Sequence, residues 1–346
     1  MKKAGISFLL LFFLFACNNS NTPDVSGIKV TLQVVRFEDD FFSIDTNHVY
    51  ESLGALHQKY PVFLQDYLQN ILGLPPFTDT STQVFDAIRQ FLRDYRPLKD
   101  SVDKTFPGNA SWEPELTRSL QYLHYYFPNY KAPEKVFTFI GPMDAYFQAS
   151  LGAYGDVLSR AGLAVGLQLH LGKDFSMYHS EMGQSLYPDY ISRRFTPDYI
   201  AVNCVKNLLD DIHPDDPKAK SLLGQMVEKG KKLYVLDKLM PATPDSLKIG
   251  YTGKQLEGCY ANEGRIWNFF LTNNLLLNSE PGMLKGYISD APNTPEFGEG
   301  SPGFIGLFCG RQIVRKFMEE HAALSLDSLL KIDPQQLYQL SKYRPK

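Results

Sequence analysis

The stretch "YIAVNCVKNLLDD", residues 199–211, decides how the rest of the chain is interpreted. Its apolar residues recur at helical spacing over about three to four turns, which predicts a largely buried helix over 197–212. Thr196 and Pro197 supply a capping residue and a first-turn proline at its start. Polar side chains, among them Asn203 and Asn207, stand in the middle of this helix. The sequence therefore raises the question of whether the helix carries a functional site.

The region before this helix contains three predicted strands. Runs with β-branched residues predict strands over 28–38 and 135–141. In "GLAVGLQLHLG", residues 162–172, Leu and Val alternate with Ala, Gly, Gln and His, which predicts a third strand with two unlike faces. Apolar and aromatic residues at helical spacing predict helices over 49–72, 83–95 and 113–127. The pattern after residue 172 is helical, so the expected fold class is α+β, mostly helical with a small sheet.

A further helix is expected after Ser301 and Pro302, through "GFIGLFCGRQIVRKFM". Gly303, Gly306 and Gly310 are spaced so that they fall on one side of it, as a stripe without side chains. Each glycine in a helix interior costs roughly 1 kcal/mol relative to alanine. Such a stripe is typical of two backbones in close contact, so we expect another element to pack tightly against it.

The N-terminus, "MKKAGISFLLLFFLFAC", has two lysines and then an apolar run that is too short to span a bilayer permanently. This pattern predicts a signal peptide over 1–16. The residues up to Cys17 fit a bacterial lipobox, in which cleavage precedes the cysteine and its thiol carries lipid. Residues 17–27 then form the lipidated cysteine and a polar tether, and residues 28–346 are expected to form a single periplasmic domain.

Residue 18 is asparagine rather than the aspartate linked with inner-membrane retention, and the tether lacks an acidic cluster. These features favour the periplasmic face of the outer membrane. The net charge is -3 and no basic tract is present, which argues against a nucleic-acid partner. Three further cysteines, Cys204, Cys259 and Cys309, have apolar or aromatic neighbours and are predicted to be small buried residues without disulfides.

Several segments together resemble one known family. They are "VVRFEDDFFSID", "HYYFPNY", "GKKLYVLDKLMP", "IGYTGKQLEGCYANEGRIW", "SPGFIGLFCGRQIVRKFM" and "LSKYRPK". With the lipobox, they look like the pattern of GldB, the gliding-motility lipoproteins of gliding bacteria, in the same order and over nearly the whole chain. The resemblance implies an envelope lipoprotein anchored to the membrane through Cys17, with other gliding proteins and the linked type IX secretion machinery as partners.

The GldB family is in turn similar, more distantly, to predicted zinc peptidases, and this similarity implies a zincin-like core. If the strand 162–172 corresponds to the peptidase edge strand, the metal-binding pentad falls on residues 203–207. Asn203 and Asn207 then stand where two histidine ligands would be, and Cys204 where the glutamate base would be. Lys229 stands at the third ligand position, and a charged lysine cannot ligate zinc. The resemblance therefore implies a degenerate metal site and no catalytic residues.

An alternative metal cluster would use His170 and His179, with Asp174 and Glu181 nearby, but its spacing matches no standard zinc motif. We expect no cofactor. Three hypotheses remain: a non-catalytic lipid-anchored scaffold or assembly factor, a periplasmic peptidase with unrecognised chemistry, and a glycan- or peptide-binding lipoprotein. The substituted pentad favours the first hypothesis, so we expect that the protein is not an enzyme.

Overall fold

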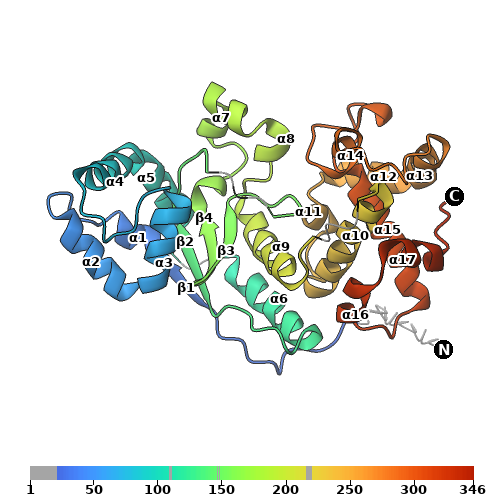
Figure 1. The fold of residues 1–346 in the computed structure, drawn as a ribbon, viewed down its shortest axis with the longest axis horizontal. Coiled ribbons are helices and arrows are strands. Elements are labelled where there is room, and N and C mark those ends of the chain that lie inside the picture. Colours follow the sequence, from blue (N-terminus) through green and yellow to red (C-terminus); the bar gives the residue numbers. More distant parts are fainter. Residues whose placement is uncertain (1–21, 109–110, 146, 148, 216–219) are drawn as a thin grey trace, which may run out of the picture.

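The fold is a small mixed sheet with helices packed around it and a largely helical C-terminal half (Figure 1). A computed structural model describes residues 22–108, 111–145, 147, 149–215 and 220–346. The predicted signal peptide and Cys17 lie outside these residues. One cluster of buried hydrophobic side chains includes residues from Val25 to Tyr343. The expected α+β class is confirmed.

The sheet has four strands in the order β1-β2-β4-β3. The strands are β1 (Gln33–Arg36), β2 (Lys135–Phe139), β3 (Asp156–Ser159) and β4 (Gly162–Gly166). β1, β2 and β4 are parallel, and β3 pairs antiparallel with β4, so that Asp156 lies opposite Val165. The antiparallel edge strand is therefore β3, and β4 lies inside the sheet. The premise that 162–172 forms the edge strand is wrong.

The predicted strands are longer than the observed ones. In the segment 28–38 only β1 forms, because α1 (Phe37–Phe41) begins directly after it. In the segment 162–172 the strand ends at Gly166 and the short 3-10 helix η2 (Leu167–Leu169) follows. All five residues of β4 are buried, since both faces of this inner strand are covered. The expectation of one strand with two unlike faces is therefore wrong.

The helices between β1 and β2 lie on one side of the sheet, except α6 (Glu113–Tyr126), which lies on the other side (Figure 1). The helix predicted over 49–72 is interrupted at Tyr60, because the residue before a proline is disfavoured in helical conformation. It consists of α2 (Val49–Lys59), α3 (Pro61–Asp66) and the π-helical turn η1 (Tyr67–Ile71). The following helices are α4 (Thr82–Asp94), α5 (Arg96–Thr105) and α6 (Glu113–Tyr126). The sequence analysis missed α5.

Short helices connect the sheet to the C-terminal half. They are η3 (Ser176–His179), α7 (Glu181–Leu186), α8 (Asp189–Ser192) and η4 (Pro197–Tyr199). The C-terminal half consists of α9 (Ile200–Ile212), α10 (Leu222–Leu239), α11 (Asp245–Ile249), α12 (Gly253–Ala261), α13 (Glu263–Thr272), α14 (Pro281–Ile288), η5 (Pro295–Phe297), α15 (Ile305–Glu320), α16 (Leu326–Lys331) and α17 (Pro334–Ser341). Within the described residues, no helix combines the length and the apolar character needed to cross a bilayer.

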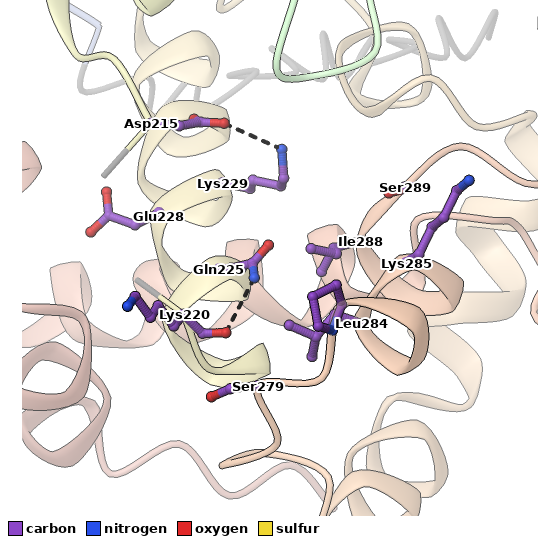
Figure 2. Close-up of a pocket in the computed structure, with 11 residues that line it drawn as sticks. Asp215, Lys220, Gln225, Glu228, Lys229, Ser279, Leu284, Lys285, Ile288 and Ser289 are labelled. Atoms are coloured by element: carbon purple, nitrogen blue, oxygen red, sulfur yellow. Dashed lines mark hydrogen bonds and ion pairs between the residues drawn. The ribbon is translucent and has the colours of Figure 1, made fainter. Parts of the chain in front are cut away.

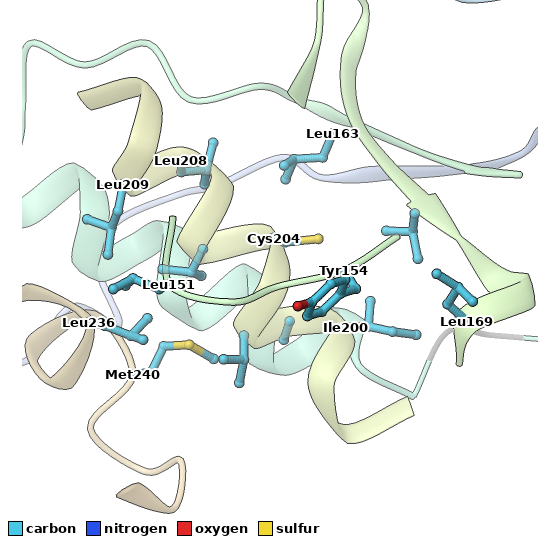
Figure 3. Packing of buried hydrophobic residues seen from close by; sticks show 14 of the residues in the cluster. Leu151, Tyr154, Leu163, Leu169, Ile200, Cys204, Leu208, Leu209, Leu236 and Met240 are labelled. Carbon is cyan, nitrogen blue, oxygen red and sulfur yellow. The ribbon is translucent and has the colours of Figure 1, made fainter. Parts of the chain in front are cut away.

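Helix α9 packs between the sheet and the C-terminal helices (Figure 3). Its apolar side chains up to Leu209, including Ile200 and Leu208, are buried, and Ile212 at its end is partly buried. Cys204 is also fully buried, and burial raises the pKa of its thiol well above the ordinary value. Cys259 and Cys309 are buried as well, and none of the three forms a disulfide, as predicted.

Helices α10 and α15 are in direct backbone contact. A Cβ atom placed on Gly310 would lie 1.7 Å from the carbonyl oxygen of Met226, and one on Gly230 would lie 2.3 Å from the backbone of Gly310. A Cβ atom on Gly306 would lie 2.8 Å from the carbonyl oxygen of Tyr287. These positions are therefore restricted to glycine by close backbone approach.

The helix that carries these glycines starts later than expected. Phe304, at φ 54°, precedes its first residue, Ile305. Gly303 thus lies in the preceding loop, where a Cβ atom would meet the carbonyl oxygen of Ala291 at 2.3 Å. The assignment of Gly303 to the helix is wrong, although it too lies against a neighbouring backbone. The left-handed conformation of Phe304 is the physical reason, because it breaks the helical path just before Ile305.

Candidate functional site

Asn203 on α9 and His170 after β4 meet at one buried carboxylate, that of Asp156 at the start of β3. Asn203 Nδ2 donates to Asp156 Oδ2 at 2.9 Å, and His170 Nε2 lies 3.0 Å from both carboxylate oxygens. The backbone N–H of Gly166 donates to Asp156 Oδ1 at 3.1 Å. The side chains of Asp156, His170 and Asn203 are at most 5% exposed. Asp156 is therefore held by three donors in the interior, as a buried carboxylate requires.

Asn207 completes this cluster from the next turn of the helix. Its Nδ2 donates to the backbone oxygen of Asp156 at 3.2 Å and to that of Asn203 at 3.0 Å. Residues four apart share a helix face, so both amides reach the same strand. We call Asp156, His170, Asn203 and Asn207 the Asp156 cluster. It binds the end of β3 to α9.

A second polar cluster lies on another side of α9. Asp210 accepts from the backbone N–H of Ser150 at 2.7 Å and from its hydroxyl at 2.5 Å, and Lys232 Nζ donates to Asp210 at 2.8 Å. Lys206, one turn earlier, donates to the carbonyl oxygen of Leu151 at 3.1 Å. Burial, with a smaller contribution from nearby Arg194, lowers the pKa of Lys206 to about 7. These contacts fix the segment 149–151 against α9.

Lys229 belongs to this second region. Its Nζ donates to the carbonyl oxygen of Ser150 at 2.6 Å and lies 3.9 Å from Asp215 Oδ2. The neighbouring Glu228 points elsewhere, to Lys231 at 2.7 Å and His213 at 2.9 Å. The structure thus brings Asn203 and Asn207 together at Asp156, and it places Lys229 with other partners. The expected correspondence of Lys229 with a third ligand of the same metal centre has no support in this geometry.

The two histidines of the alternative metal cluster do not meet. His170 contacts Asp156, whereas His179 Nε2 lies 2.9 Å from the carbonyl oxygen of Lys173 on the surface. The side chain of Asp174 is 83% exposed and pairs with Lys173. In the part of the chain that the structure describes, no group of three His, Cys, Asp or Glu residues is arranged to hold a metal ion.

The residue that sequence reasoning missed is Asp156. It begins a strand of only four residues, and aspartate disfavours strands, so the pattern of β3 is weak. One signal was present in the sequence "DVLSRAGLAV": two short apolar runs around a turn that ends in Gly162, which is typical of a hairpin. Gly162 has φ 143°, a backbone conformation that other residues rarely adopt.

The fold and the site define an α+β domain whose central helix is joined to the edge strand by buried polar contacts. The model of the family described as gliding motility protein GldB matches residues 18–345. The chain belongs to this family of gliding-motility lipoproteins. Searches of the curated proteins and of the solved structures find no match.

Proposed function

We propose that this GldB-family protein is a non-catalytic, lipid-anchored component of the cell envelope. It supports gliding motility and the associated type IX secretion machinery, from the periplasmic face of the outer membrane. The family match supports the motility role. The lipobox at Cys17 supports the anchor, and the asparagine at residue 18 supports the outer membrane.

The Asp156 cluster is the observation that supports the absence of catalysis, because its polar groups are buried and bonded to one another. The pentad positions Asn203 and Asn207 use their amide groups to hold Asp156, and Cys204 is fully buried with a raised thiol pKa. A nucleophile or a metal ligand must be accessible and in the right protonation state. These three side chains instead stabilise the junction between α9 and β3. On this proposal α9 is a structural helix. The protein has a peptidase-like fold that lacks the metal site.

A metal and activity measurement tests the absence of catalysis. Full-length protein purified in detergent is expected to contain no stoichiometric zinc and to hydrolyse a mixed peptide substrate no faster than buffer. The joint change Asn203→His, Cys204→Glu and Asn207→His supplies the zincin residue types on α9, and zinc uptake by this variant would support the peptidase ancestry. One zinc per wild-type chain, measured by elemental analysis, would overturn the non-catalytic proposal.

Cell fractionation tests the anchor. Cys17→Ser is expected to move the protein out of the membrane fraction and to abolish colony spreading, while the protein remains folded. Cys259→Ser is the matched control, because it removes a buried thiol outside the signal region and leaves the lipobox intact. A Cys17→Ser protein that still pellets with membranes after a high-salt wash would contradict anchoring by this lipid.

Crosslinking in intact cells tests the partners. We expect the wild-type protein to crosslink to other envelope proteins of the motility and secretion apparatus, and Cys17→Ser to lose these products. Crosslinked products that contain only unrelated periplasmic proteins would contradict the assignment to this machinery.

A further inference from the structure

Two adjoining cavities form a groove between α10 and α14. One has a volume of about 440 Å³ and the other about 450 Å³, and both are within the size range of ligand sites. They share the lining residues Lys229, Lys285, Ile288 and Ser289, so they are continuous. Figure 2 shows Lys229 on α10 and Lys285 on α14, with Ile288 and Leu284 between them. The groove is therefore lined by a lysine from each of the two helices and by apolar side chains of α14.

The negative charges that line the groove are already neutralised. Each of the three carboxylates is paired with a cation that does not line either cavity: Asp215 with Lys232 at 2.6 Å, Glu228 with Lys231 at 2.7 Å, and Asp290 with Arg194 in close contact. Those three cations are at most 5% exposed. Because each pair cancels locally, the charge that the groove presents to a ligand comes from its own lysines.

The lysines of the groove lack comparable partners. Among the residues that the structure describes, Lys229 has one hydrogen bond, to the carbonyl oxygen of Ser150, and one carboxylate within 4 Å, with Asp215 Oδ2 at 3.9 Å. An ammonium group has three donors, so at least one of them is left for a ligand. Burial lowers the pKa of Lys229. The carboxylates of Asp215 and Asp210 partly oppose this shift, and Lys232 adds to it. Lys285 is exposed and forms no ion pair with any residue that the structure describes.

The remaining lining residues determine the kind of anion. Leu284, Ile288 and Pro281 provide apolar contacts, and Ser279, Ser289 and Gln225 provide neutral hydrogen-bonding groups. A nucleic acid or other extended polyanion needs a run of cationic groups along its backbone, whereas Lys220, Lys229 and Lys285 are the cations that line this groove among the described residues. A ligand with one carboxylate next to apolar and amide groups fits all of these contacts. We propose that the groove between α10 and α14 binds an acidic peptide segment, with its carboxylate attracted by Lys229 and Lys285 and an apolar side chain on Leu284 and Ile288.

Peptide binding by the full-length protein in detergent tests this proposal. The probes are two fluorescent pools of random hexapeptides, one with Glu fixed at the third position and one with Gln there. We expect the Glu pool to bind at least about tenfold more tightly than the Gln pool, which corresponds to about 1.4 kcal/mol, and to weaken as salt is added. Equal binding of the two pools, or no binding of either, would overturn the proposal.

Variants locate the site. Lys285→Gln and Lys229→Met are each expected to reduce binding of the Glu pool about five- to tenfold and to leave binding of the Gln pool unchanged. Lys254→Gln is the matched control, because Lys254 is exposed on α12 and lines neither cavity. Equal losses in Lys254→Gln and Lys285→Gln would show a general charge effect and would contradict the site. Complete competition by inorganic phosphate at the peptide's own concentration would show a bare anion site and would also contradict it.

This inference is independent of the proposed motility role, because binding is measured on isolated protein without the envelope machinery. A failure here removes the peptide site and leaves the anchor and motility experiments unaffected.

Discussion

The two central helices, α9 and α10, are held in different ways. Helix α9 is joined to the sheet by the Asp156 cluster, in which amide and imidazole groups surround one carboxylate. Helix α10 contacts α15 through backbone atoms at Gly230 and Gly310, and the fully buried Arg311 pairs with Asp237 at 2.6 Å beside this contact. The adjacent residue Lys229 lines a cavity beside this contact. Polar residues thus serve different purposes in the two helices.

This difference teaches how to separate structural from functional polar residues. In the Asp156 cluster every described polar side chain contacts another member or a backbone group, so the cluster is closed to ligands. In the groove the carboxylates form ion pairs with buried cations that do not line it, and Lys229 retains N–H groups that donate no hydrogen bond to a described residue. A substitution should therefore affect stability at the first site and binding at the second.

The largest effect is expected at the contact between α10 and α15. Gly310→Leu would place a side chain at the position of the Met226 carbonyl, so we expect a loss of more than about 4 kcal/mol of unfolding free energy, or no folded protein. Gly306→Leu should cost less, about 1 to 3 kcal/mol, because its closest contact is longer. Denaturant unfolding measures both.

Gly258→Leu is the control for these glycine changes. Nothing lies within 4 Å of a Cβ atom at this position on α12, so the unfolding midpoint should not fall. A stable Gly310→Leu protein would show that α10 and α15 can move apart. The distinction between the backbone contact of α10 and the polar contacts of α9 would then fail.

The next effect is expected at the Asp156 cluster. Asp156→Ala removes the shared acceptor and leaves His170 and Asn203 buried without it, which should cost about 3 to 5 kcal/mol. Asp174→Ala, at an exposed carboxylate, should change the unfolding free energy by less than about 0.5 kcal/mol. If both variants unfolded at the same denaturant concentration, the cluster would not be the junction that holds α9.

A third test uses a buried carboxylate with fewer partners. Glu38 accepts one hydrogen bond from Thr138 at 2.6 Å, and Arg36 lies 3.2 Å from its other oxygen without a hydrogen bond. Burial raises the pKa of Glu38 to about 7 from 4.5, and these two neighbours only partly oppose the shift. The folded protein therefore keeps this proton between about pH 4.5 and 7, while the unfolded chain loses it.

Stability from Glu38 is consequently present below about pH 4.5 and is lost as the pH rises to about 7, by up to about 3 kcal/mol. Glu38→Gln should remove this decline and be more stable than wild type at pH 8. Glu51→Gln, at an exposed acid on α2, is the control. Unfolding curves at pH 4.5 and pH 8 measure the difference, and parallel pH profiles for all three proteins would contradict the prediction.

The smallest effect on stability is expected in the groove. Lys229→Met removes one hydrogen bond, to Ser150, but also removes a poorly paired buried charge, so the unfolding free energy should change by less than about 1 kcal/mol. Thermal unfolding is a sufficient measurement. A loss of about 3 kcal/mol or more would show that Lys229 is structural, and the distinction between the two helices would fail.

Much of the fold was predictable from local patterns. The buried character of α9, the boundaries of α4 and α6 to within one residue, and the buried cysteines follow from apolar spacing and composition. The ends of β1 and β4 and the missed strand β3 were not predictable, because short strands are stabilised by their neighbours rather than by their own residues. Pro61 indicated the helix break at Tyr60, but the continuous apolar spacing over 49–72 favoured the prediction of one uninterrupted helix.

The sequence by itself determined the family, the α+β class and the polar residues inside α9, because these depend on residue order and periodicity. Only the tertiary structure decided what those residues do. Asp156 is 47 residues from Asn203 in the chain, and their contact exists because β3, which pairs with β4, begins beside α9. Lys229 and Lys285 likewise line the same groove because α10 and α14 pack against each other. Local periodicity encodes which face of a helix is buried, whereas the partner at that face depends on long-range packing of the whole chain.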